Sequence, residues 1–178
     1  MTTRDTYSEL AAPLALRRMQ AEIHMNSARV LRGMERRVQA LFENEGIRQM
    51  TPAQGNVLMV LFHQRKPTRA KKLAQISSVS EVTMGRFVHA LEASGWVERT
   101  RDPDDARAWL VSPTTQAYGT LSALIRVSHR MMDEAFKGFD TDDIERFHTQ
   151  TRRVVDNLAE QADGDSSDSV ISSEKAGS

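Results

Sequence analysis

The sequence predicts a mostly α-helical fold with a small β-hairpin wing, in which a winged helix-turn-helix domain is flanked by long helices. Apolar residues recur at steps of three and four over most of the chain, as amphipathic helices require. Two β-branched and aromatic runs, at 96–99 and 108–111, enclose a charged loop containing a proline, which indicates one hairpin. A short helix at 69–76 is followed closely by another from residue 80, which is the spacing of a helix-turn-helix.

Composition limits the class of protein before any motif is considered. The chain has 178 residues, of which 39% are hydrophobic and 27% charged, a globular composition. Its formal net charge of zero argues against unspecific coating of nucleic acid but permits a local basic patch. Cysteine is absent, which excludes disulfides, a cysteine nucleophile and a thiol redox sensor. The chain lacks a membrane-length apolar run and an N-terminal secretory signal, so we expect a cytoplasmic protein without a membrane partner.

The first region, residues 1–45, is predicted to be a dimerisation helix. The helix begins at Pro13, because proline suits a first turn, and ends at Glu45, where Gly46 suits the C-cap. One stripe of this helix is apolar: Leu16, Met19, Ile23, Val30, Met34, Val38, Leu41 and Phe42. The first and last helices together carry more apolar surface than a monomer could readily cover, which favours a homodimer.

The second region, residues 46–113, is predicted to be the winged helix-turn-helix domain. Thr51 and Gln54 have the spacing of a capping box, and the helix that they begin stops at Pro67. Ser80 caps the second helix of the helix-turn-helix, whose buried face is Met84, Phe87, Val88 and Leu91.

The remaining residues form two further regions. Residues 114–162 are predicted to be C-terminal dimerisation helices, the first opened by Thr114 or Thr115 and ended by Gly138, the second capped by Thr141. Residues 163–178 are acidic and poor in apolar side chains, so we expect a disordered tail there.

The second helix of the helix-turn-helix is the candidate reader of DNA. Val82, Arg86 and His89 point away from its buried face, so that Arg86 can reach guanine and Val82 a thymine methyl group. Gly85 costs a helix about 1 kcal/mol relative to alanine, but a residue without a side chain lets DNA approach the backbone. The predicted DNA-contacting residues of this helix are Ser80, Val82, Thr83, Gly85, Arg86 and His89.

Basic residues around this helix add two further candidate contacts with DNA. Arg101, Asp105 and Arg107 are assigned to the wing, where Arg107 suits a narrow minor groove and a carboxylate–guanidinium contact with Asp105 could brace the loop. Arg69, Lys71 and Lys72 are assigned to the DNA backbone. Taken singly, the basic cluster is also explained as a solvated face and the wing tip as an exposed turn with a surface salt bridge.

Enzyme chemistry finds no support in the sequence. There is no Gly-rich phosphate loop, no HExxH and no nucleophile elbow. The five histidines show no metal-ligand spacing: His24, His63, His89, His129 and His148. We therefore expect no enzymatic activity, no metal and no cofactor. The alternative to a DNA-binding protein is a winged-helix adaptor that binds other proteins.

The middle of the chain resembles the MarR family of bacterial transcription regulators. The resemblance lies in MTPAQGNVLMVL, in KLAQISSVSEVTMGRFVHALEASGWVERTRDPDD, and in the wing signature Asp105-x-Arg107 followed by Thr114. It implies a triangular homodimer that binds pseudo-palindromic double-stranded operators, with Ser80, Val82, Thr83, Gly85 and Arg86 on the recognition helix and Asp105 and Arg107 on the wing. Ser77 and Ser78 replace the hydrophobe–glycine pair that the family usually has in the turn.

The same resemblance implies a repressor that a small aromatic acid releases from its operator. Pockets in the family lie where the dimerisation helices meet the winged domain. In this sequence, the corresponding candidate pocket residues are Arg18, His24, Met25, Arg29, Met59 and His63. A histidine or arginine beside apolar walls suits an aromatic carboxylate.

Overall fold

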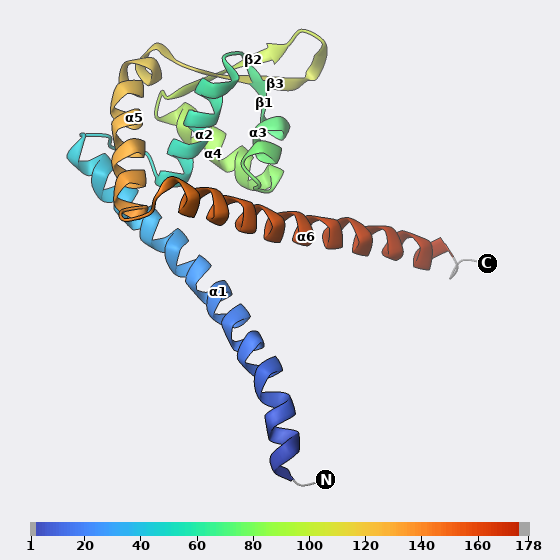
Figure 1. Cartoon of the computed structure of the whole chain (residues 1–178). Coiled ribbons are helices and arrows are strands. Elements are labelled where there is room, and N and C mark those ends of the chain that lie inside the picture. The colour runs from blue at the N-terminus through green and yellow to red at the C-terminus, as the bar shows by residue number, and fades with distance from the viewer. Residues whose placement is uncertain (1–2, 175–178) are drawn as a thin grey trace. The chain divides into compact units, whose positions relative to one another are not determined.

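The computed structural model describes the backbone of residues 3–174 and the side chains of residues 13–159 apart from residue 106. In this range it is mostly helical with one small sheet, which confirms the predicted fold class (Figure 1). The elements, in chain order, are α1 (Thr3–Asn44), α2 (Pro52–Gln64), β1 (Thr68–Arg69), α3 (Ala70–Ile76), α4 (Glu81–Ala93), β2 (Val97–Asp102), β3 (Asp105–Pro113), α5 (Thr115–Ala135) and α6 (Thr141–Glu174). The chain divides into two compact units, one up to Met132 and one from Asp133 onward, and each is described by itself.

The sheet of the first unit is antiparallel, with the strand order β1-β3-β2. Its hairpin is longer than predicted, because β2 and β3 extend to a tight turn at Pro103 and Asp104. The two-residue strand β1 was not predicted; Thr68 pairs with Val111 and Arg69 with Leu110. So short a strand has no periodicity to detect, and only the presence of β3 beside it makes it a strand.

The core of the first unit lies between α2, α3, α4 and the base of the hairpin. Its largest fully buried side chains are Leu58, Leu61, Leu73, Met84, Leu91, Val57 and Val111. The predicted capping box at α2 is present: the Gln54 N–H donates to Thr51 Oγ1, and the Thr51 N–H donates to Gln54 Oε1. α2 ends at Gln64, before Pro67, because Arg65 adopts a left-handed C-cap conformation with φ of 53°.

The last turns of α1 join this core. Leu41 and Phe42 are buried, and Gly55 of α2 lies so close that a Cβ there would be 2.7 Å from Cζ of Phe42. Glu45, just past the end of α1, accepts a 2.5 Å hydrogen bond from Nη2 of Arg126 in α5. This hydrogen bond lowers the pKa of Glu45.

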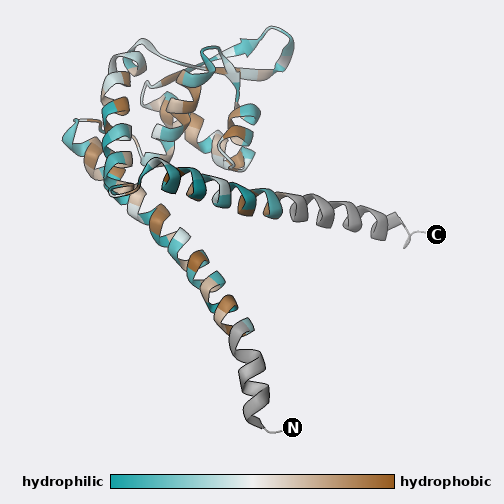
Figure 2. Ribbon diagram, viewed as in Figure 1, coloured by the Kyte–Doolittle hydropathy of each residue, from teal (hydrophilic) through white to brown (hydrophobic). Residues whose placement is uncertain are grey.

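The earlier part of α1 differs from prediction at its start and leaves apolar residues exposed. The helix begins at Thr3, not at Pro13, which lies inside it. The prediction was wrong because the residues before the proline, ELAA at 9–12, favour a helix and the proline removes only one backbone donor. Figure 2 shows the hydrophobic residues along this helix; those that are exposed include Leu16, Met19, Ile23 and Val30.

The second unit contains the end of α5 and the whole of α6. Three phenylalanine rings, Phe136, Phe139 and Phe147, pack edge to face with centroids 5.8 to 6.5 Å apart. The cap of α6 is Asp140, whose carboxylate accepts from the Asp143 N–H at 2.8 Å, and not the predicted Thr141. An ionised carboxylate is the stronger acceptor at a helix N-terminus, where the helix dipole also favours negative charge.

The predicted disorder over residues 163–178 stays a prediction, although the described backbone is helical over most of this tail. α6 continues as a helix to Glu174, while residues 175–178 lie outside the described part of the chain. No proline interrupts this stretch, so a helix already begun can propagate at the small cost per residue that weak helix formers impose.

Candidate nucleic-acid interface

The helix-turn-helix consists of α3, a tight turn and α4. Ser80 caps α4 as predicted: its Oγ accepts from the Thr83 N–H at 3.1 Å and lies 2.9 Å from Thr83 Oγ1. Both hydroxyls, which the sequence assigns to DNA, therefore also hold the first turn of the helix that would carry the base contacts.

The turn before α4 has a strained residue that the sequence signals. Val79 donates to the carbonyl of Ala74 and Ser78 to that of Gln75, the pair of bonds that makes a Schellman motif. Ser78 has φ of 51°, a left-handed conformation that favours glycine. The serine pair in the turn therefore forms the usual geometry at a conformational cost.

One face of α4 is bare, as predicted. Val82 is 69% exposed, and Gly85, Arg86 and His89 are exposed as well. The opposite face is buried, with Met84 fully enclosed in the core. Thr83 lies at the edge between the two faces and is half-buried. Within the first unit, the side chains chosen for base contact therefore form one continuous outward surface.

The wing tip is braced by its main chain. Asp105 Oδ1 accepts from the backbone N–H of Arg107 at 3.1 Å, in place of the carboxylate–guanidinium contact expected from the sequence. An Asx-type bond of this kind needs only the two residues that follow the aspartate, so it forms without ordering a long side chain. Arg101 and Arg107 are both exposed.

The tip end of β2 contains an ion pair with a buried carboxylate, which the sequence reasoning missed. Arg69 Nε donates to Asp102 Oδ2 at 2.5 Å, and the Asp102 side chain is 5% exposed. Asp102 also accepts from the Asp104 N–H at 2.9 Å. The hydrogen bond from Arg69 is the largest cause that lowers the pKa of Asp102.

This ion pair changes the role expected for Arg69. The sequence assigns Arg69 to the DNA backbone. In the structure, Arg69 directly precedes α3, and its guanidinium pairs with Asp102 at the bulged end of β2. A signal was present, because Asp before Pro commonly accepts from a backbone N–H two residues on. The long-range partner was not predictable, since 33 residues separate the two side chains.

The other basic candidates and the recognition helix have their own contacts. Lys71 lies 3.7 Å from Glu81 of α4 in an exposed ion pair, and Lys72 is exposed. On the other side of the domain, Arg99 Nη2 of β2 lies 2.6 Å from Glu92 Oε2 of α4. The wing is therefore tied to the helix-turn-helix at two points, through Asp102 and through Arg99.

A cavity of about 420 Å³ lies between α1, α2 and α5 of the first unit. Of the six predicted pocket residues, Met59 and His63 line it, whereas Arg18, His24, Met25 and Arg29 lie on the exposed part of α1. The remaining lining residues are mostly apolar: Leu31, Met34, Glu35, Val38, Phe42, Pro52, Ala53, Gly55, Asn56, Leu124, Val127, Ser128, Met131 and Met132.

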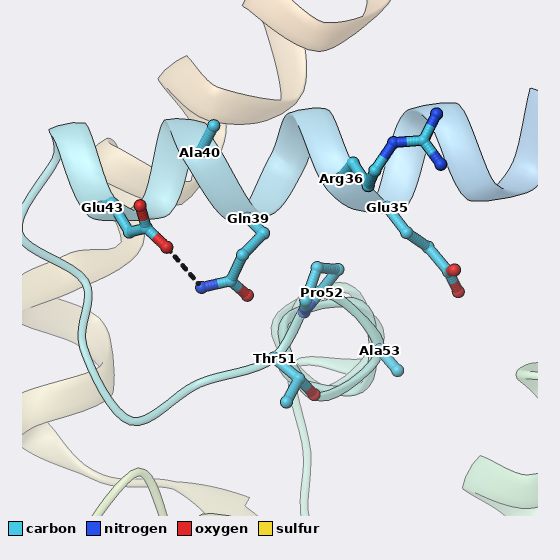
Figure 3. A pocket seen from close by; sticks show the side chains of 8 residues that line it. All are labelled: Glu35, Arg36, Gln39, Ala40, Glu43, Thr51, Pro52 and Ala53. Carbon is cyan, nitrogen blue, oxygen red and sulfur yellow. Dashed lines mark hydrogen bonds between the residues drawn. The ribbon is translucent and has the colours of Figure 1, made fainter.

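Four pocket candidates were predicted wrongly because α1 extends well beyond the part of it that lines the cavity. Within α1 the lining of the cavity begins at Leu31, whereas the four candidates lie earlier in the helix and are exposed. A second, shallower pocket lies where α1 crosses the start of α2 (Figure 3). It is lined by residues of α1 and by Thr51, Pro52 and Ala53 at the start of α2. Among the residues of α1, Gln39 donates to Glu43 at 3.3 Å.

The described residues hold no metal-binding cluster and no membrane-spanning helix. In this part of the chain, no group of three or more His, Asp or Glu side chains is arranged to hold a metal ion. No described helix combines the length and apolar character needed to cross a bilayer.

The bare face of α4, the turn that precedes it and the tethered hairpin define a winged helix-turn-helix protein. Residues 50–109 match the model of the MarR family, so this winged helix-turn-helix domain is that of the MarR family. The family resemblance seen in the sequence is thereby confirmed, and the proteins of this family are transcription regulators.

Solved structures agree with this assignment. A probable transcriptional regulator from Pseudomonas aeruginosa is 25% identical, with a TM-score of 0.60 over 71% of this chain and 95% of that chain. A MarR mutant from E. coli complexed with operator DNA is 23% identical, with a TM-score of 0.65 over 76% and 92% of the two chains. A MarR regulator from Methanosarcina mazei is 19% identical, with a TM-score of 0.66 over 78% and 98%. No curated protein sequence matches the chain significantly.

Proposed function

We propose that the protein regulates transcription by binding a pseudo-palindromic DNA operator as a homodimer. In this proposal, α4 lies in the major groove and the wing in the adjacent minor groove. The observation that carries the proposal is the exposed face of α4, where Arg86 stands between Val82 and His89 on a rigid helix. The E. coli structural neighbour is bound to operator DNA, which supports DNA binding by the same fold here.

The charge distribution favours DNA over a protein partner. Arg86 lies on the bare face of α4, and Arg101 and Arg107 extend from the wing, although the whole chain has no net charge. Bidentate donation from an arginine to guanine is worth about 1–3 kcal/mol of discrimination against other bases. Cations on the wing suit phosphates and the narrow minor groove.

A homodimer is supported by apolar surface in both units. Four residues of the α1 stripe are about half or more exposed: Leu16 at 52%, Met19 at 55%, Ile23 at 63% and Val30 at 49%. In α6, Val154, Val155 and Leu158 are also exposed. A twofold dimer would set two copies of α4 about 34–36 Å apart, one turn of DNA. Measurement of the mass at micromolar concentration tests this; a monomer would contradict it.

The binding experiment separates sequence-specific binding from the adaptor function. A duplex recovered from a random-sequence library by selection on the protein is titrated at several salt concentrations. With eight to ten phosphate contacts in a dimer, the logarithm of affinity falls against log salt with a slope of about −7 to −9. If no duplex is enriched and retention on DNA does not depend on salt, the adaptor function replaces the proposal.

The Arg86→Ala variant tests the base contact. It is expected to weaken binding by about 1–3 kcal/mol and to relax preference at one position of each half-site. Arg48→Ala, which removes an exposed arginine from the loop between α1 and α2, is the matched control and should leave binding unchanged. Equal losses for Arg86→Ala on all sequences would mean that the side chain contacts only phosphate.

The regulator is further proposed to be a repressor that a small aromatic acid releases. The cavity beside α1 has the volume of a small-molecule site, with methionines as walls and His63, Asn56 and Ser128 as polar groups. Hydroxybenzoate and nicotinate are the probes. Either acid should weaken operator binding by the wild type, and His63→Ala should reduce this response while binding DNA normally. No response to either acid would remove the effector from the proposal.

A further inference from the structure

On one face of the wing, the indole of Trp109 lies against two arginines of the neighbouring strand. Arg101 is the register partner of Trp109, and its guanidinium carbon lies 4.1 Å from the ring centroid. The guanidinium carbon of Arg99 lies 5.5 Å from the same centroid. Both distances are within the range of cation–π attraction, which is strongest for tryptophan.

The position of this group on the sheet explains why the indole is outside the core. Paired residues share a face, and faces alternate along each strand. At the base of the hairpin, this face carries Val111 and Val97, which are both buried. Toward the tip the same face carries Trp109, which is 40% exposed, and Arg101, which is exposed. The indole therefore continues an apolar face outward, beyond the point where the domain can cover it.

Contact with the indole can restrict the orientation of an arginine side chain, as a salt bridge does elsewhere in the wing. An arginine side chain has a large rotamer entropy, which it loses when it binds a phosphate. Stacking on a ring removes part of that freedom beforehand, and a stacked guanidinium can still donate from its in-plane N–H groups. Arg99 is also held by Glu92 at 2.6 Å, and Arg101 is the arginine whose guanidinium lies closer to the ring.

We propose that Trp109 is a positioning residue for DNA binding, which holds Arg101 in the orientation in which the wing meets DNA. The inference rests on the proposed DNA-binding function. It adds a residue that acts through Arg101 and would not be identified from contacts with DNA. It predicts that the aromatic ring, rather than apolar bulk at position 109, determines the contribution of the wing to affinity.

The test compares three variants on the selected duplex. Trp109→Ile places an apolar, strand-favouring residue at this position but removes the ring, and is expected to weaken binding about two- to fivefold per wing, the size of an exposed cation–π contact. Trp109→Phe keeps a ring and should recover most of the affinity. Thr100→Val, on the opposite face of the hairpin, is the control and should bind as the wild type.

A double-mutant cycle separates positioning from a structural effect. In an Arg101→Gln background, Trp109→Ile should cause no further loss, because the side chain that it positions is gone. Thermal unfolding of every variant shows whether the fold is kept. An equal loss from Trp109→Ile with and without Arg101, or a loss that Trp109→Phe does not recover, would overturn the inference.

Two outcomes distinguish this inference from the function on which it rests. If the wild type binds no duplex in a salt-dependent way, DNA binding itself fails. If the wild type binds and Trp109→Ile binds equally well, only the role of Trp109 fails. Fluorescence gives an independent readout: the DNA-induced change in emission of the wild type should be smaller in Trp109→Phe, because Trp96 is buried.

Discussion

Replacement of Gly85 by alanine is expected to stabilise the fold and weaken DNA binding at the same time. Gly85 is the fifth residue of α4, and a Cβ built there meets no atom within 4 Å. Alanine in a helix interior is favoured over glycine by about 1 kcal/mol. For a chain of this length, this gain raises the unfolding midpoint by about 2–4 °C. The space is open in the protein alone, so any penalty must come from a partner.

Gly119 offers a matched control for this substitution. It is the fifth residue of α5, and a Cβ there also meets no atom within 4 Å. Gly119→Ala should therefore raise the midpoint by a similar amount and leave DNA binding unchanged. Gly85→Ala adds a methyl group to the surface that is proposed to meet DNA; overpacking of about 1 kcal/mol per half-site corresponds to roughly a fivefold loss.

Thermal unfolding and anisotropy of a labelled duplex measure the two effects in the same preparations. Unchanged DNA affinity in Gly85→Ala would show that DNA does not approach the backbone there, and the glycine would have no functional reason. A lower midpoint in Gly85→Ala, with a higher one in Gly119→Ala, would refute the open environment described for α4. Equal loss of binding in both variants would point to an effect on the whole fold.

Three further predictions concern stability and the wing. Gly55→Ala should lower the free energy of unfolding by up to about 2 kcal/mol, because overpacking against Phe42 costs about 1–3 kcal/mol and the better helix propensity of alanine returns about 1 kcal/mol. A higher urea midpoint of unfolding would contradict the close approach of α1 and α2. Ser78→Gly should raise the free energy of unfolding by about 1 kcal/mol by relieving its positive φ, and an unchanged midpoint in urea would argue against strain. The pKa of Asp102 is lowered by Arg69, so this carboxylate contributes stability above its unfolded pKa and loses it as pH falls through the folded value; Asp102→Asn should flatten that acid limb in a pH series of unfolding, and an identical limb would refute the ion pair.

Local signals predicted the elements that hold the candidate site. The capping box from Thr51 to Gln54, the cap at Ser80 and the apolar spacing around Met84 all lie within a few residues, and each is present in the structure. The exposed face of α4 follows from the same spacing, because a helix that buries one side must present the other.

Pairings across long sequence distances were beyond such signals. Nothing near Arg69 indicates that its partner is Asp102, and nothing near Trp109 indicates that Arg101 stacks on it. The cavity shows the same limit: Met59 and His63 line it, whereas Arg18 does not, because the direction and length of α1 decide which residues reach it.

The sequence by itself determined the order of helices and hairpin, the caps that begin α2 and α4 and the side of α4 that is bare. Periodicity and capping depend on residues within one or two helical turns, and such local patterns can be recognised in the sequence alone. Only the tertiary structure decided that Arg69 braces the wing, that β1 exists and that two arginines lie over one indole. Those contacts join residues whose distance in space depends on how the whole domain closes.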